Sequence, residues 1–135
     1  MKESGLVTAD AWIRDDLDPA IHGAGWEEFR EIWATTGEKP DGLVVLDDAL
    51  FADAQLALIE MGLRVPGDLQ LVVQTNRGAS PPARVPIVAV EIDPDESAAA
   101  HVEMLMKRLR GDPLAPTTRL LSFCEIGRAS CRERV

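Results

Sequence analysis

The stretch Lys39-Pro40-Asp41-Gly42-Leu43-Val44-Val45-Leu46-Asp47-Asp48 decides the fold class of this 135-residue chain. A turn over residues 39–42 leads into four consecutive apolar residues, a continuous rather than an alternating run. Such a run is typical of a strand that is buried on both faces, as in a parallel sheet. We therefore expect a central strand over 43–46 that ends at two carboxylates, Asp47 and Asp48.

A helix is expected directly after this strand. Asp48 is suited to cap its first turn, and Gly62 supplies a left-handed stop at its C-terminus. Between them, four apolar residues fall on one side of a helix with 3.6 residues per turn. These residues are Phe51, Ala54, Leu58 and Met61.

The same alternation of short apolar runs and longer helical patterns continues through the chain. Further strands are expected over 11–13, 69–73, 87–90 and 120–123, and further helices before Gly37 and over 93–111. This alternation is typical of βαβ units. It predicts an α/β fold with a mostly parallel sheet flanked by helices.

Both further helices carry an apolar stripe. The first places three aromatic residues on one face, and the second begins at Asp93 as a cap, with Pro94 at its first position and Glu96 placed to complete a capping box. Gly111 ends the second helix. The stripes expected to face the core are Trp26, Phe29 and Trp33 in the first helix, and Ala98, Val102, Leu105 and Leu109 in the second.

Charge and hydropathy exclude several classes of protein. Acidic residues outnumber basic ones by 23 to 14, and the formal charge of −9 would repel a phosphate backbone. The apolar runs fall far short of the roughly 20 residues that span a bilayer, and the start of the chain lacks the regions of a secretory signal. We expect a cytoplasmic protein that does not itself bind nucleic acid or membrane.

No pattern typical of a catalytic or metal site is present. His22 and His101 lie far apart and no nucleophile motif accompanies them. Cys124 and Cys131 form no metal-type pair, and the aspartates of residues 15–18 lack the glycine and glutamate of a calcium loop. We therefore expect no enzymatic activity, no cofactor and no metal.

Polar residues that follow the expected strands are the candidate ligand-binding residues, because ligands of open α/β sheets bind at the carboxyl ends of strands. Asp47 and Asp48 follow one strand, and Gln74, Thr75 and Asn76 follow the next. Carboxylates and amides suit a hydroxyl-rich ligand. The alternative remains open that Asp48 is only a helix cap and Asp47 only a solvated loop acid.

The stretch quoted first, together with Glu60-Met61-Gly62-Leu63-Arg64-Val65-Pro66-Gly67-Asp68-Leu69, resembles the second half of LacI/GalR-type transcription regulators. In that family the strand ends in an Asn-Asp pair, and the next helix runs into a Gly-Leu-Arg-Val-Pro-x-Asp segment. Residues 62–68 match this segment, and the likeness extends over nearly all of residues 1–123. It implies the C-terminal subdomain of a periplasmic-binding-protein type I-like fold.

The resemblance also implies the ligand site. Family members hold sugars or nucleobases with the Asn-Asp pair and with an acidic pair after the following strand. By position these sites are Asp47, Asp48, Thr75 and Asn76. Asp47 replaces an asparagine, and Thr75 and Asn76 replace acids, so the identity of the ligand stays open.

The partners implied by the resemblance are a small-molecule effector, a sugar or sugar derivative, and DNA. DNA would be bound only through an N-terminal helix-turn-helix that lies outside this chain. Related proteins of this fold pair through both subdomains, so a homodimer stays open.

Two alternatives accompany this interpretation. A transport-associated sugar-binding protein of the same fold would need a secretory signal upstream. A receiver domain with Asp47 as the phosphoacceptor is disfavoured, because receivers need a later lysine and none lies between Lys39 and Lys107.

The two ends of the chain carry separate expectations. Residues 1–6 look like the end of a helix that begins in a missing N-terminal part. The last eleven residues, 125–135, resemble the translation of a common sequencing adapter. We therefore expect a ligand-sensing subdomain over 1–124 and a non-native tail over 125–135.

Overall fold

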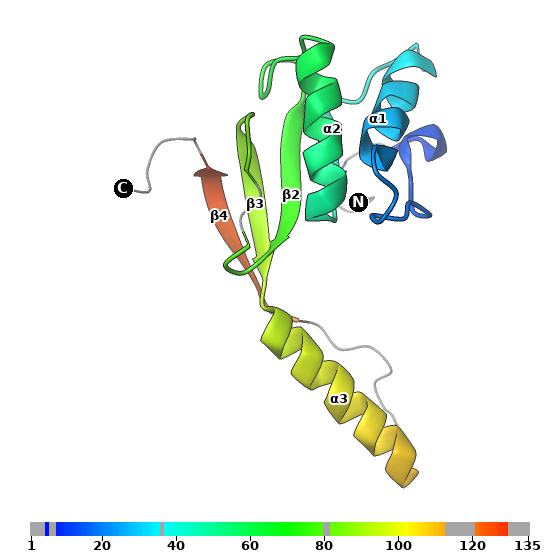
Figure 1. Ribbon diagram of the computed structural model, residues 1–135, viewed down its shortest axis with the longest axis vertical. Helices are drawn as coiled ribbons and strands as arrows, with labels where there is room; N and C mark the ends of the chain where they lie inside the picture. The colour runs from blue at the N-terminus through cyan, green and yellow to red at the C-terminus, as the bar shows by residue number, and fades with distance from the viewer. Residues whose placement is uncertain (1–4, 6–7, 36, 80–81, 113–120, 130–135) are drawn as a thin grey trace.

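The computed structural model describes residues 5, 8–35, 37–79, 82–112 and 121–129. The predictions for residues 1–4, 6, 120 and 130–135 therefore lie outside the described residues. Figure 1 shows the helices and strands, which are interspersed along the chain. They are the 3-10 helix η2 (Asp10–Trp12), α1 (Ala24–Thr35), β1 (Gly42–Val45), α2 (Asp48–Glu60), β2 (Gln70–Asn76), β3 (Ile87–Ile92), α3 (Pro94–Arg110) and β4 (Phe123–Ala129).

The strands form one sheet in the order β1-β2-β3-β4. The pairs β1–β2 and β2–β3 are parallel, and β4 runs antiparallel to β3. Parallel neighbours need a crossover connection, and α2 supplies the crossover between β1 and β2. The expected α/β fold with a mostly parallel sheet is confirmed.

The core lies between the sheet and α2, which packs on β1 and β2 (Figure 1). The apolar stripe predicted for this helix is confirmed, because Phe51, Ala54 and Leu58 are buried and Met61 packs against the same cluster. Gly62 follows the helix with a left-handed φ of 69°, as predicted. The burial of this one face holds the helix to the sheet.

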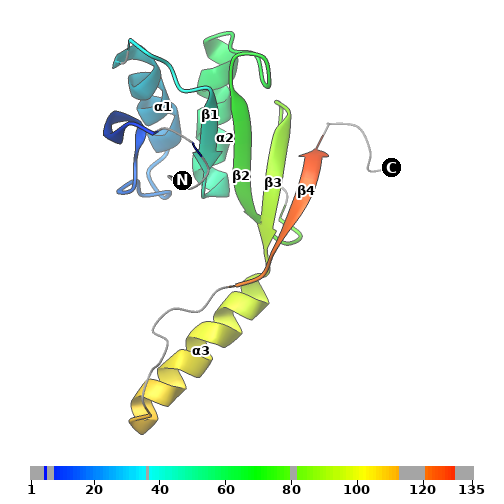
Figure 2. The same ribbon diagram turned by 180° about the vertical axis from the view of Figure 1, so that it is seen from behind.

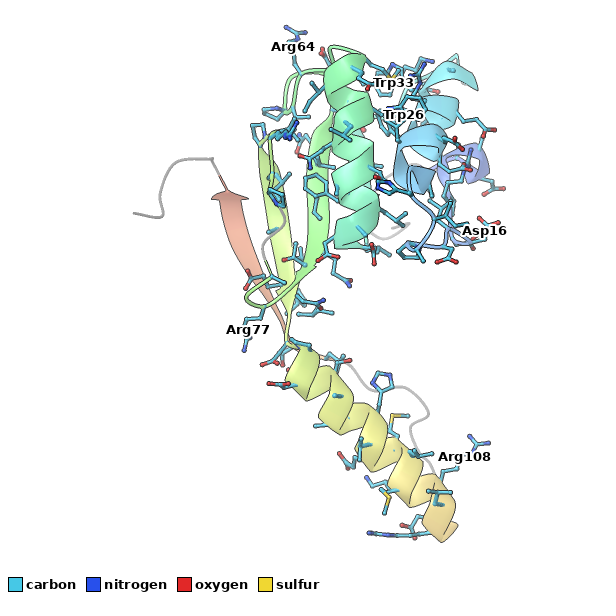
Figure 3. All side chains as sticks on the ribbon, in the orientation of Figure 1. Asp16, Trp26, Trp33, Arg64, Arg77 and Arg108 are labelled. Atoms are coloured by element: carbon cyan, nitrogen blue, oxygen red, sulfur yellow. The ribbon has the colours of Figure 1, made fainter. Side chains whose placement is uncertain are left out.

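The predicted aromatic stripe of α1 packs against α2. Phe29 is buried, Trp26 and Trp33 are partly buried against the core, and the rings of Phe29 and Trp33 stack at a centroid distance of 5.8 Å. Figure 3 shows both tryptophans on the side of α1 that faces α2. The stripe is therefore a packing surface, as expected.

The prediction that residues 43–46 form a central strand buried on both faces is wrong. Among the described residues β1 is an edge strand of the sheet, and Val44 and Leu46 are 63% and 68% exposed. Seen from behind, the strands lie in front of α2 (Figure 2). Within the described residues, helices cover only one face of β1, so the residues on its opposite face stay accessible.

The strand expected over 11–13 is also absent. The N–H of Trp12 donates to the carbonyl of Ala9, and the N–H of Ile13 donates to that of Asp10, so this segment closes a 3-10 turn. Its backbone hydrogen bonds are therefore local, and it joins no strand of the sheet.

Several strand boundaries differ from the prediction, by one residue in β1 and by more in the later strands. β2 continues to Asn76 and β3 to Ile92. These two residues form the last paired position of the two parallel strands. β4 begins at Phe123, where the predicted strand ended, and continues to Ala129 along β3. The assignment of residues 125–135 as a non-native tail stays a prediction.

The stripe predicted to be buried on the last helix is exposed. α3 extends away from the sheet beyond the end of β3 (Figures 1 and 2). Ala100 is its buried residue, whereas Val102, Leu105 and Leu109 are 59%, 58% and 73% exposed. The pattern marks an apolar face correctly, but no element within the described residues packs on it.

The ends of α3 agree better with the prediction. Asp93 Oδ1 accepts from the N–H groups of Asp95 and Glu96, and Gly111 ends the helix with φ 78°. The capping box does not close in the described residues, since the carboxylate of Glu96 instead accepts from Ser122.

Candidate functional site

A pocket of about 210 Å³ lies at the carboxyl ends of β1 and β2. Val45 of β1 pairs with Val73 of β2. Asp47 and Thr75 lie two residues after this pair, so they lie at the same end of the sheet. The structure thereby brings together all four residues predicted for the ligand site. The lining consists of Leu46, Asp47, Asp48, Gln74, Thr75 and Asn76.

Asp47, not Asp48, caps α2, which corrects the expectation from the sequence. Its Oδ1 accepts from the N–H groups of Ala49 at 2.8 Å and Leu50 at 3.0 Å. The backbone of Asp47 is extended, with φ −146° and ψ 136°, as an N-cap requires. One carboxylate oxygen of the pocket is thus engaged by the protein itself.

Asp48 begins the first turn of α2 and is a partly buried residue. Among the described residues it has no hydrogen-bond or ion-pair partner. The positive end of the helix dipole favours a carboxylate at this place. Its oxygens remain available as acceptors at the pocket.

Thr75 is the most buried polar residue of the pocket lining. Its exposed fraction is 4%, and its Oγ1 has no hydrogen-bond partner in the described part of the chain. Leaving a buried hydroxyl unpaired costs on the order of 1–3 kcal/mol.

The pocket combines two carboxylates with the amides of Gln74 and Asn76, and no cationic side chain lines it. Arg77 follows the last lining residue, but its guanidinium binds Asp93 at 2.6 Å and its N–H donates to the carbonyl of Ile92. Figure 3 shows Arg77 at the end of the sheet from which α3 departs. The site is therefore rich in acceptors and negatively charged.

Leu46 is the lining residue that sequence reasoning did not consider for the site, because it was assigned to the apolar end of a buried strand. Gln74, Thr75 and Asn76 belong to β2 rather than to a loop after it. Strand pairing therefore fixes the backbone of three lining residues. The signal for these residues was their polarity at the end of an apolar run.

The two histidines do not line this pocket. His22 is fully exposed near Asp53, and Nδ1 of His101 contacts the carbonyl of Ser97 within α3. No group of three His, Cys, Asp or Glu residues suited to a metal ion is found in the described part of the chain. The helices described there include none that is long and apolar enough to cross a membrane.

Comparisons with known proteins bear on the fold. The profile of the family described as "Periplasmic binding protein-like domain" matches residues 1–131. A crystal structure of an uncharacterized protein from Actinobacillus succinogenes is similar with a TM-score of 0.57 and 23% sequence identity. The likeness covers 79% of this chain and 38% of that one, so this chain spans well under half of the solved protein. No curated protein matches.

Proposed function

The chain belongs to the family of periplasmic binding protein-like domains, and from this premise we propose that it is the effector-binding part of a LacI/GalR-type transcription regulator. The proposed effector is a sugar or a similar hydroxyl-rich molecule that binds at the carboxyl ends of β1 and β2. The observation that carries the proposal is the buried hydroxyl of Thr75, a residue of the pocket lining, which has no partner among the described residues.

The chemistry of the pocket supports a hydroxyl-rich ligand. The carboxylate of Asp48 accepts from a ligand hydroxyl, and the amides of Gln74 and Asn76 both donate and accept. The Thr75 hydroxyl donates or accepts according to its partner. A sugar offers neighbouring hydroxyls that match such a set of groups.

In the proposed regulator, this chain forms one wall of the binding cleft and a second lobe forms the other. Effector closes the two lobes because it contacts both of them, and closure favours one orientation of the DNA-binding heads. DNA binding then belongs to a helix-turn-helix outside this chain. The formal charge of −9 agrees with this division of roles.

Amide chemical shifts of the isotope-labelled chain, titrated with glucose, galactose and ribose, test the proposed site. We expect weak binding, because a single wall contacts the ligand, with shifts concentrated at Asp48, Thr75 and Asn76. In the full-length protein, Asp48→Ala should weaken sugar binding by about 1.5–3 kcal/mol, the contribution of one charged hydrogen bond. If no sugar shifts the pocket amides, the proposed effector site is wrong.

A transport-associated binding protein of the same fold is the second candidate, because a periplasmic binding protein-like domain would serve it equally well. It would use the same pocket without DNA-binding heads. Sequencing the source DNA upstream of Met1 separates the two functions. A frame that encodes a helix-turn-helix supports the regulator, whereas one that encodes a secretory signal supports the transport protein.

A further inference from the structure

We propose that the ligand carries a positively charged amine next to its hydroxyls, and that Asp48 is the residue that selects it. This inference rests on the proposed function of the same pocket and narrows its ligand class to amine-bearing polyols, such as amino sugars. The reason is that Asp48 has no cationic partner among the described residues, and no cationic residue lines the pocket.

A helix N-terminus ordinarily attracts anions, because its first N–H groups lack partners within the helix. At the start of α2, two of these N–H groups already donate to a side chain of the protein. Asp47 Oδ1 accepts from the N–H groups of Ala49 and Leu50 at 2.8 Å and 3.0 Å. Asp48 adds a second carboxylate in the same turn. A phosphate or carboxylate on a ligand would therefore meet negative charge at this helix end.

Asp48 lacks the cationic partner that two other partly buried carboxylates of the described residues have. Glu28 pairs with Arg14, and Asp93 pairs with Arg77 at 2.6 Å. Asp48 has no cation or donor among the described residues. Removing a carboxylate from water is unfavourable unless an opposite charge or hydrogen bonds compensate.

No side chain of the pocket supplies that compensation. None of the lining residues is cationic, and Arg77, which follows Asn76, is engaged by Asp93. A ligand ammonium supplies both the opposite charge and three N–H donors. Asp48 is therefore the binding partner expected for a ligand amine.

Thr75 adds the second recognition element. Its Oγ1 is buried and has no partner in the described residues. A hydroxyl on the ligand pairs with Thr75 while its amine pairs with Asp48. The pocket therefore matches a ligand that carries an amine and a hydroxyl close together.

Titrations with four related probes test the inference: glucosamine, glucose, N-acetylglucosamine and glucose 6-phosphate. Binding to the full chain is followed through amide chemical shifts at mildly acidic pH, where the glucosamine amine is protonated. We expect glucosamine to bind at least about tenfold more tightly than glucose, because its amine forms a charged hydrogen bond. N-acetylglucosamine, which is uncharged, should resemble glucose, and glucose 6-phosphate should bind more weakly than either.

Two substitutions test the role of Asp48 itself. Asp48→Asn keeps the size of the side chain but removes its charge, so glucosamine should lose more affinity than glucose and the preference for glucosamine over glucose should disappear. Asp16→Asn is the matched control, because Asp16 is exposed and does not line the pocket. It should leave all four affinities unchanged. Circular dichroism establishes that both variants are folded.

The outcomes separate this inference from the proposed function. Equal affinity for glucose and glucosamine, or tightest binding of glucose 6-phosphate, overturns the amine selectivity and leaves a sugar site. Failure of all four probes overturns both. If Asp48→Asn does not fold, the comparison of glucosamine with glucose on the unaltered chain still decides the selectivity.

Discussion

The side-chain amide of Gln55 accepts a hydrogen bond from the backbone N–H of Arg84 at 2.9 Å, although the two residues are 29 positions apart. The same amide donates to the carbonyl of Pro82 at 3.2 Å, and Gln55 is only 4% exposed. A single side chain of α2 thus holds the segment that leads into β3. This arrangement sets the start of β3 at the end of the sheet opposite the pocket.

Gln55→Leu should therefore destabilise the protein. It removes both hydrogen bonds but keeps a side chain of similar length, so we expect a loss of about 1–3 kcal/mol in the free energy of unfolding. Urea denaturation measures this loss. The exposed Leu56 next to it provides the control, since Leu56→Ala should cost clearly less. Equal costs would show that Gln55 does not hold this segment.

Gly25→Ala should also destabilise the fold. A Cβ atom at Gly25 would lie 2.3 Å from the carbonyl oxygen of Leu50, so α1 and α2 would have to move apart. Overpacking of this kind costs about 1–3 kcal/mol, which outweighs the gain in helix propensity from alanine. Gly42→Ala is the control, because nothing lies within 4 Å of its added Cβ. Thermal unfolding of both variants measures the difference.

The two neighbouring aspartates should differ in their effect on stability. Asp47→Ala removes the cap of α2 and should cost about 0.5–2 kcal/mol. Asp47→Asn keeps a side-chain oxygen at the cap and should cost less. Asp48→Ala should have a smaller effect than Asp47→Ala, because Asp48 accepts no N–H from the described backbone. Chemical denaturation that ranked Asp48→Ala as the more damaging change would contradict the assignment of the cap.

Arg64 lowers the pKa of Asp68 to about 2 from 3.8, chiefly through side-chain hydrogen bonds of 2.6 Å and 3.0 Å. A carboxyl with a lowered folded-state pKa contributes stability above pH 3.8, and this contribution is lost as the pH falls toward 2. Arg64→Gln should therefore raise the Asp68 pKa toward its ordinary value. NMR titration of the carboxyl carbon measures it.

Arg108→Gln serves as the control for that titration. Arg108 lies on α3, far from Arg64 at the opposite end of the molecule (Figure 3). Its replacement should leave the Asp68 pKa unchanged. An equal shift in both variants would point to a general effect of net charge instead of a local pair.

α3 should exchange its amide hydrogens faster than α2. Helices in proteins gain most of their stability from packing of an apolar face, and only Ala100 of α3 is buried within the described residues. The pair formed by Glu103 and Lys107 at 2.7 Å is exposed and adds only about 0.3–0.5 kcal/mol. Hydrogen exchange followed by NMR tests this. Equal protection in α2 and α3 would show that α3 has a packing partner.

The sequence by itself determined the features that depend on neighbours along the chain. Gly62 and Gly111 end helices because each adopts a left-handed φ, and Asp93 caps α3 through N–H groups two and three residues ahead. The candidate pocket was predictable as well. Polar residues at the ends of two parallel strands lie together whenever those strands are neighbours in the sheet.

Only the tertiary structure decided which predicted faces are buried. The apolar stripes of α2 and α3 have similar spacing, yet Leu58 is fully buried and Leu109 is 73% exposed. The apolar run at Val44 likewise predicted a central strand, but it lies at an edge. The physical reason is that spacing sets which side chains share a face, whereas burial requires a second element to pack on that face.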